Sequence, residues 1–149
     1  MILPDYDGGS IVNLMSSIES ACGGNPRYPA LRALPPAEIA AARNLILLVI
    51  DGLGYEYLLQ SRAHALRKLP QTRITSVFPS TTATAITTFL TGLAPQQHGL
   101  TGWFTYFREI GSVAAVLPFQ PRHGGRSYRE SGIEVATLFG NTPFFDRIA

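Results

Sequence analysis

Six consecutive large apolar residues, Leu45 to Ile50, end directly in Asp51 and Gly52. A continuous apolar run is typical of a strand that is covered on both faces, as in a mostly parallel sheet. A hydrophobic content of 46% with 15% charged residues supports a well-covered core and argues against disorder. We therefore predict an α/β fold, a mostly parallel sheet with helices on both faces.

The order of helices and strands supports this fold class. Apolar periodicity, caps and turn residues predict the following elements: a helix from Ser10 to Cys22, a short helical turn over 36–43, a strand over 44–50, a helix over 55–69, a strand over 72–78, a helix over 81–91, a hairpin over 103–117, a loop over 120–131, a strand over 134–139, and a helix that opens at 141–143. Strand and helix alternate through the middle of the chain, which favours right-handed crossovers.

The length of 149 residues suits one domain. We divide it into an N-terminal helix and connector (1–42), a core that carries the reactive residues (43–101), and a hairpin, a loop and the start of a next unit (102–149). The last predicted helix opens close to residue 149, so we expect the fold to be incomplete at the C-terminus.

Composition disfavours several other classes. The net charge is +2 and the arginines are scattered, so no nucleic-acid binding is expected. Cys22 is the only cysteine, so no disulfide can form within the chain. The N-terminus lacks the features of a signal peptide, and the longest apolar run is too short to span a membrane. We expect a cytoplasmic protein that does not bind membranes.

Asp51 is the first candidate site residue. In open α/β sheets, ligands bind at the carboxyl ends of the strands, where Asp51 is predicted to lie. Its carboxylate is a hard oxygen donor suited to a divalent metal. Asp-Gly is also a common turn pair. On the local residues alone, both interpretations stay open.

Thr82 is the second candidate. Residues 78–84 (FPSTTAT) place three hydroxyl side chains at the cap and first turn of a predicted helix. Free amides and the helix dipole favour a phosphate group there. A hydroxyl in that turn, if bound to a metal, can lose its proton and attack phosphorus. An ordinary capping cluster without catalytic function is the alternative.

Three segments together resemble the type I phosphodiesterase and nucleotide pyrophosphatase family of the alkaline phosphatase superfamily. They are residues 48–54 (LVIDGLG), residues 78–83 (FPSTTA) and residues 91–100 (TGLAPQQHGL). The first is similar to the family's strand that ends in a metal-binding Asp, the second to its nucleophile turn, and the third to its TGLxPxxHG signature. The strong resemblance covers residues 43–103 and implies an alkaline-phosphatase-like fold.

The resemblance implies a reaction and its residues. Asp51 would help to hold a pair of divalent metals, usually zinc, and Thr82 would touch one of them. Thr82 would attack the phosphoryl group of a small phosphate ester or nucleotide and form a phospho- or nucleotidyl-threonine that water hydrolyses. The metals would activate the hydroxyl and neutralise oxygen charge. His98 of the third segment would brace the turn after the helix.

The chain departs from the family pattern at two places. Family members usually place an Asn shortly after the His-Gly signature, where this chain has Trp103, which could stack on a base or aryl group or pack as a core or lid aromatic. Further Asp and His ligands lie well downstream in the family. Here only Asp146 and His123 follow, neither in a matching motif, so we expect a truncated piece that lacks most metal ligands.

Two alternatives to this phosphodiesterase hypothesis stay open. One is another hydrolase or mutase of the same superfamily, such as a phosphomonoesterase or a sulfatase-like enzyme. The other is a non-catalytic α/β remnant. The sequence predicts neither the substrate nor the oligomeric state.

Overall fold

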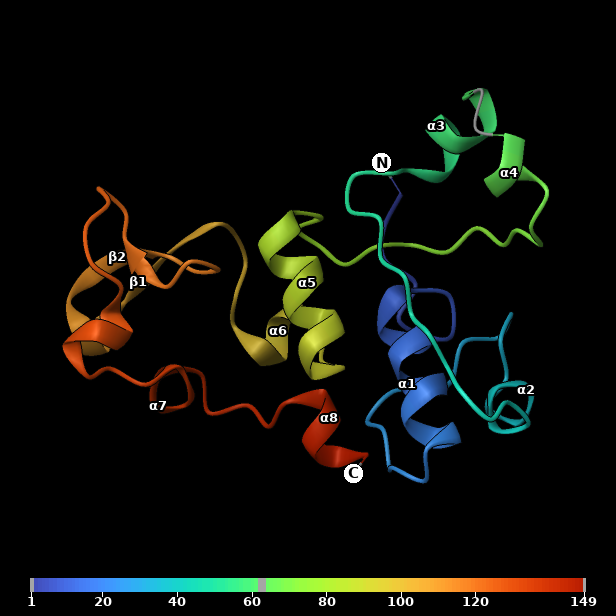
Figure 1. The fold of residues 1–149 in the computed structure, drawn as a ribbon, viewed down its shortest axis with the longest axis horizontal. Helices are drawn as coiled ribbons and strands as arrows, with labels where there is room; N and C mark the ends of the chain where they lie inside the picture. The colour runs from blue at the N-terminus through green and yellow to red at the C-terminus, as the bar shows by residue number, and fades with distance from the viewer. Residues whose placement is uncertain (1, 62–63, 149) are drawn as a thin grey trace.

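A helix rich in small and β-branched residues lies at the centre of the molecule (Figure 1). The computed structural model describes residues 2–61 and 64–148. The central helix is α5 (Thr82–Thr91), which begins after Thr81 in extended conformation and ends at Gly92 in the left-handed region (φ 66°). The predicted helix over 81–91 is thus confirmed, with the glycine stop that the sequence indicated.

The N-terminal helix α1 (Ile11–Ala21) packs beside α5 and against α2 (Pro36–Ala40). Its N-cap is Ser10, as predicted, and both Ser10 N and Ser10 Oγ donate to Asn13 Oδ1, at 3.0 and 2.6 Å. The apolar face of α1 contributes Met15 and Ile18 to a buried cluster with Ile39 and Phe144. This amphipathic pattern is the reason that the helix could be predicted from spacing alone.

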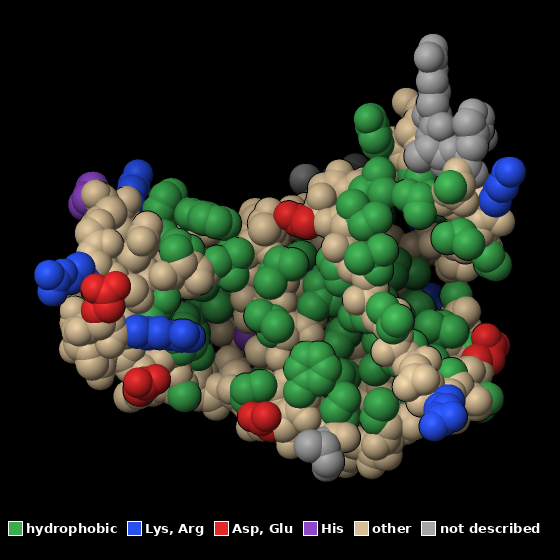
Figure 2. All heavy atoms as spheres, viewed as in Figure 1, with side chains coloured by type: hydrophobic (Ala, Val, Ile, Leu, Met, Phe, Trp, Pro, Cys, Tyr) green, Lys and Arg blue, Asp and Glu red, His purple; other side chains and the backbone are tan. Residues whose placement is uncertain are grey.

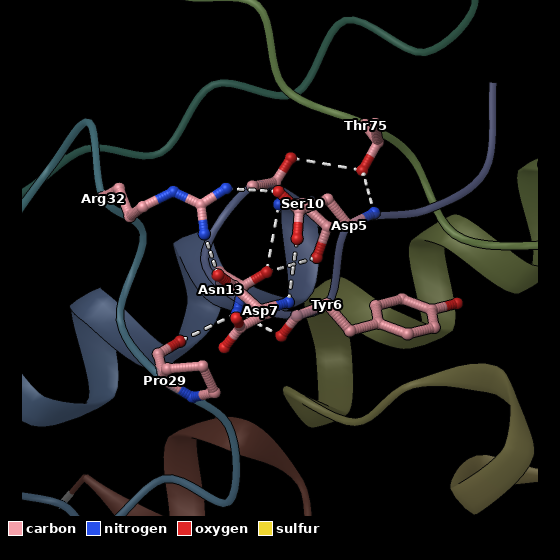
Figure 3. Close-up of polar contacts among 9 residues, drawn as sticks. Asp5, Tyr6, Asp7, Ser10, Asn13, Pro29, Arg32 and Thr75 are labelled. Atoms are coloured by element: carbon pink, nitrogen blue, oxygen red, sulfur yellow. Dashed lines mark hydrogen bonds and ion pairs between the residues drawn. The ribbon is translucent and has the colours of Figure 1, made fainter.

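The buried Asn13 side chain connects the segment before α1 with the segment after it (Figure 3). Its Nδ2 donates to the carbonyls of Tyr6 and Pro29, at 2.8 and 2.9 Å. Thr75 joins the same region, because Asp5 N donates to its Oγ1 and the backbone pairs with Ser10 in a single parallel bridge. A fully hydrogen-bonded polar cluster of this kind fixes the position of each segment.

The hairpin on the other side of α5 is also confirmed. Strand β1 (Phe104–Phe107) pairs antiparallel with β2 (Ser112–Ala115), with Phe104 opposite Ala115 and Phe107 opposite Ser112. A 3₁₀ turn, η1 (Arg108–Ile110), connects them and ends at Gly111. The inward side chain of Phe107 packs with Leu100 and Ala114 in a second buried cluster.

The predicted loop over 120–131 contains more structure than expected. Strand β3 (Gln120–Pro121) adds to β2, so the sheet has the order β1-β2-β3 and is antiparallel throughout. A second 3₁₀ turn, η2 (Tyr128–Ser131), follows, with Ser127 Oγ accepting from Arg129 N. A two-residue strand gives no period to detect, which is why the sequence pattern missed it.

The largest correction concerns the apolar run 44–50, which is extended but has no strand partner among the described residues. Segment 72–78 is also extended and makes only the bridge at Thr75. The predicted mostly parallel sheet is therefore absent from the described residues, whose sheet is antiparallel. An apolar run encodes the tendency to be covered in a sheet, but a strand forms only where a partner supplies the hydrogen bonds.

Two shorter segments differ from their predictions, and a third agrees. The strand predicted over 134–139 is wrong, because the segment forms α7 (Val135–Phe139) and ends at Gly140. The helix predicted over 55–69 appears as α3 (Tyr55–Gln60) and α4 (His64–Arg67), while residues 62–63 lie outside the described part. The helix after 141–143 is confirmed as α8 (Phe144–Arg147). Short apolar runs such as VATLF cannot be assigned to helix or strand by periodicity.

Helix α8 closes the fold by packing on α5 and inserting Phe144 beside α1. Arg147 Nε and Nη2 donate to the two carboxylate oxygens of Glu19, at 3.1 and 2.9 Å. Glu19 is only 3% exposed. The C-terminal segment is therefore joined to α1 by a largely buried, bidentate ion pair.

Candidate functional site

The structure brings Asp51 and Thr82 together. Thr82 Oγ1 donates a hydrogen bond to Asp51 Oδ2 at 3.0 Å. Thr82 is the first residue of α5, and Asp51 lies in the turn after the apolar run, where Leu53 N donates to the carbonyl of Ile50. Thus the two residues that the sequence singled out are direct neighbours, although the run before Asp51 is not a paired strand.

The first turn of α5 presents open hydrogen-bond donors beside Thr82. The amides of Thr82, Ala83 and Thr84 lack an intrahelical acceptor by their position, and no side chain caps them. The N-cap hydroxyl of Thr81 is instead paired with the Thr84 hydroxyl at 2.9 Å. The positive end of the helix dipole therefore faces the same surface as the Thr82 hydroxyl, which suits an anion.

Both side chains of the pair are exposed to solvent. One hollow of about 460 Å³ is lined by neighbours of the pair in sequence, Gly54 and Ser80, but not by Asp51 or Thr82 themselves. A second hollow, of about 480 Å³, lies further along α5 and is lined by Thr87 and Leu90 on one side and by residues 116–119 on the other. The pair is therefore accessible from the surface, and neither hollow encloses it.

The donor set fits part of a metal site. Two oxygens bound to one small divalent cation lie roughly 3 Å apart, since each metal–oxygen bond is about 2.0–2.2 Å long. The separation of Asp51 Oδ2 and Thr82 Oγ1 matches that value. Within residues 2–61 and 64–148, no group of three or more His, Cys, Asp or Glu side chains could hold a metal ion. The pair thus offers two oxygen ligands, which is fewer than a complete site needs.

The His98 side chain contacts α5 and holds the turn that follows it in place. It ends α6 (Pro95–His98), is buried, and accepts from Leu100 N at Nδ1, at 3.1 Å. The neutral ring therefore carries its proton on Nε2, which lies 3.3 Å from Thr88 Oγ1 of α5. Burial lowers the pKa of His98 to about 4, partly opposed by a hydrogen bond with the Thr84 backbone. The predicted bracing of the turn by His98 is confirmed.

Trp103, the weak substrate-binding candidate, lies just before β1. The residue is 44% exposed, and its carbonyl accepts from Val116 N at 2.9 Å. In the described part of the chain, no hydrogen bond or ring contact joins it to Asp51 or Thr82. Its role in substrate binding stays a prediction.

Two polar partners near the site were not identified from sequence. Thr84 pairs with the N-cap hydroxyl of Thr81, and Thr88 pairs with His98. The first could have been found, because the N-cap and the third helical residue always face each other. The second gave no local signal, since it connects two helices through the fold.

No helix in the described ranges is long or apolar enough to cross a membrane. No curated protein and no solved structure matches the chain. A family model, type I phosphodiesterase / nucleotide pyrophosphatase, matches residues 45–142, a range that contains Asp51, α5 and the sheet. The chain therefore belongs to the type I phosphodiesterase / nucleotide pyrophosphatase family.

Proposed function

We propose that this chain carries the nucleophile of a metal-dependent phosphoesterase that cleaves phosphodiester or nucleotide pyrophosphate bonds. Family membership implies hydrolysis of this general type and small phosphate esters as substrates. The observation that carries the finer proposal is the 3.0 Å hydrogen bond from Thr82 Oγ1 to Asp51 Oδ2 at the start of α5.

Thr82 is the nucleophile in this proposal. Its hydroxyl is exposed, and its hydrogen bond to Asp51 fixes the rotation of the side chain, so that an oxygen lone pair is free to face a substrate. Thr82 loses its hydroxyl proton to the solvent at this exposed position, and Oγ1 bonds to phosphorus. The alcohol or nucleotide oxygen leaves with the electron pair of its bond to phosphorus, and a phospho- or nucleotidyl-threonine remains. Water then cleaves that ester and restores the hydroxyl.

The amides at the start of α5 would bind the phosphoryl oxygens. They point from the same turn that carries Thr82, so a phosphate that reaches Oγ1 also reaches these donors. Their fixed orientation means that no rearrangement is needed as negative charge develops.

Asp51 and Thr82 would hold the family's divalent metal, with zinc as the expected ion and a second ion beside it. When bound, such a metal favours the deprotonated form of a nearby hydroxyl and neutralises phosphoryl charge. The additional ligands would have to join this pair from elsewhere, because no group of three or more His, Cys, Asp or Glu side chains could hold a metal within the described residues. The larger parallel sheet of the alkaline-phosphatase-like fold and the truncation of this chain likewise stay predictions.

The test is hydrolysis of bis-p-nitrophenyl phosphate with added zinc, by the 149-residue chain and, because its two oxygen ligands are fewer than a complete site needs, also by a longer chain that supplies further ligands. We expect release of p-nitrophenolate that chelator abolishes and that Thr82→Ala reduces by about three orders of magnitude or more. Thr82→Ser, which keeps a hydroxyl, should retain part of the activity. Thr101→Ala, at an exposed threonine away from the helix start, is the matched control.

Trapping the covalent intermediate on the protein tests whether Thr82 is the nucleophile. Rapid acid quench followed by intact mass measurement should show the p-nitrophenyl phosphoryl adduct on Thr82 in the parent chain and none in Thr82→Ala. Full activity of Thr82→Ala would reject the assignment. Parallel assays with a phosphate monoester and a sulfate ester would identify the other superfamily activities, and a chain inert to every ester and to zinc would be a non-catalytic remnant.

A further inference from the structure

The N-cap residue of α5 does not cap its own helix. An N-cap threonine ordinarily accepts a hydrogen bond from an amide of the first helical turn. The Thr81 hydroxyl instead lies 2.9 Å from the hydroxyl of Thr84, and no side chain caps the helix. The start of α5 is the upper end of the helix in Figure 1, and the surface there shows polar atoms, drawn tan, and acidic atoms, drawn red, in Figure 2. The amides of the first turn therefore stay open beside Thr82.

Thr84 has little freedom to move. Its side chain is 0% exposed, so its hydroxyl cannot turn to solvent. Its backbone is hydrogen-bonded to the ring of His98, which belongs to the next helix, α6. Within the described residues, the Thr81 hydroxyl is the only hydrogen-bond partner of the Thr84 hydroxyl. Because a buried hydroxyl needs a partner, Thr84 keeps the Thr81 hydroxyl beside it.

Two other buried threonines of α5 satisfy their hydroxyls differently. Thr87 and Thr91 each donate to the carbonyl four residues earlier, at 2.7 Å. That bond is a common arrangement for a threonine inside a helix. Thr84 could reach the carbonyl of residue 80 at the same spacing, but its hydroxyl pairs with the N-cap instead. Position 84 therefore differs from both in acting on the start of the helix.

We propose that Thr84 is a positioning residue for the proposed reaction and that it acts through Thr81. Its hydroxyl holds the Thr81 hydroxyl away from the amides of residues 82–84 and keeps those amides free for the phosphoryl oxygens of the substrate. The inference rests on the proposed function, to which it adds a residue behind the reacting atoms. It also explains the uncapped start of α5, because a capping hydroxyl would occupy a donor that the phosphoryl group needs.

Thr84→Val tests this role, because it should change stability and activity in opposite directions. Valine keeps the shape of threonine but lacks the hydroxyl, so Thr81 is released and can accept from the amide at position 84. The helix then gains a cap, and the melting temperature should stay unchanged or rise by a few degrees. The occupied amide no longer serves the substrate, so kcat/KM for bis-p-nitrophenyl phosphate should fall about tenfold or more. A purely structural role for Thr84 would instead lower the melting temperature.

Further variants test whether the effect passes through Thr81. When Thr84→Val is combined with Thr81→Val, no hydroxyl remains to cap the helix, so kcat/KM should return to within about threefold of the parent value. Thr84→Ser keeps the hydroxyl and should also stay close to the parent. Thr87→Val, which removes a buried hydroxyl further along α5, is the matched control and should leave kcat/KM unchanged.

Binding of inorganic phosphate gives a readout without catalysis. In the 149-residue parent chain, phosphate should shift the NMR signals of the amides of residues 82–84. We expect Thr84→Val to bind phosphate about tenfold more weakly and the double variant with Thr81→Val to recover the parent affinity.

The two readouts separate this inference from the proposed function. Amides that do not respond to phosphate in the parent chain would overturn the role of Thr84, as would a Thr84→Val effect that Thr81→Val fails to reverse. Hydrolysis that depends on Thr82 but not on Thr84 would overturn this inference alone. The expected pattern of phosphate binding in a chain that hydrolyses no ester would support the role of Thr84 in keeping the amides open and reject the proposed function.

Discussion

The Thr82 hydroxyl and the Asp51 carboxylate, 31 residues apart in sequence, are joined by a hydrogen bond of 3.0 Å on the exposed side of α5. Thr82 occupies the first position of a helix, and Asp51 the turn after an extended segment. Their contact depends on neither a buried environment nor a paired strand. Substitutions at these two positions can therefore test the proposed chemistry without removing buried contacts.

Thr82→Val should leave stability nearly unchanged while it removes hydrolysis. Valine keeps the shape of threonine but lacks the hydroxyl, and substitutions at exposed positions usually change the free energy of unfolding by no more than about 0.5 kcal/mol. Urea denaturation and the bis-p-nitrophenyl phosphate assay measure the two effects. A loss of several kcal/mol would show that the hydrogen bond to Asp51 mainly holds the fold.

Asp51→Asn should abolish a stabilising effect of divalent metal. A ligand that binds only the folded chain raises the melting temperature. We expect zinc to raise it for the parent chain, chelator to reverse the rise, and Asp51→Asn to show little response because an amide is a weaker ligand than a carboxylate. An equal rise in both chains would place the metal elsewhere.

His98 should make stability depend on pH. Its pKa is about 4 when folded, against an ordinary 6.5, so the unfolded chain takes up the proton first as the pH falls. Stability from this group is fully present above pH 6.5, declines between pH 6.5 and 4, and then levels off. The change in the pKa of His98 from 6.5 to about 4 corresponds to a loss of at most about 3.5 kcal/mol.

The measurement is urea unfolding at pH 7, 5.5 and 4 for the parent chain and His98→Gln. Carboxylates titrate in the same pH range, so the difference in unfolding free energy between the two chains at each pH gives the contribution of His98. His98→Gln should be less stable at pH 7, because Leu100 N and Thr88 lose their partner, but its stability should fall less on acidification. Parallel curves would contradict the assignment of the titration to His98.

Arg147→Met should destabilise the chain by about 3 kcal/mol, because it leaves the buried Glu19 carboxylate without its partner. Adding Glu19→Gln should recover much of that loss, since the uncompensated charge is then gone. Chemical denaturation of the two single variants and the double variant gives the coupling energy. Arg129→Met, at an exposed arginine without an ion pair among the described residues, is the control.

Local signals predicted the helices well. Ser10 before α1 and Gly92 after α5 are caps whose chemistry acts within one turn, so a single sequence is enough to place them. The hairpin followed from the alternation around Gly111. These elements carry their own start and stop residues.

Features that depend on distant partners could not be predicted. The run 44–50 has the composition of a buried strand, but strand formation needs a neighbour that composition does not specify. The meeting of Thr88 with His98, and of Asn13 with Pro29, arises from tertiary packing and leaves no periodic trace. The Asp51–Thr82 proximity was expected from the family resemblance, which assigns both residues to one metal site, whereas the local residues alone left other interpretations open.

The packing of Phe144 and the ion pair of Arg147 against α1 have a consequence for synthesis on the ribosome. Helix α1 is synthesised first, but its Glu19 carboxylate lacks its ion-pair partner, and the cluster of Met15 and Ile18 lacks Phe144, until residues 144–147 have been translated. Until then Glu19 is an unpaired carboxylate beside an apolar cluster that is only partly assembled. The environment of α1 is therefore complete only after α8 has been synthesised.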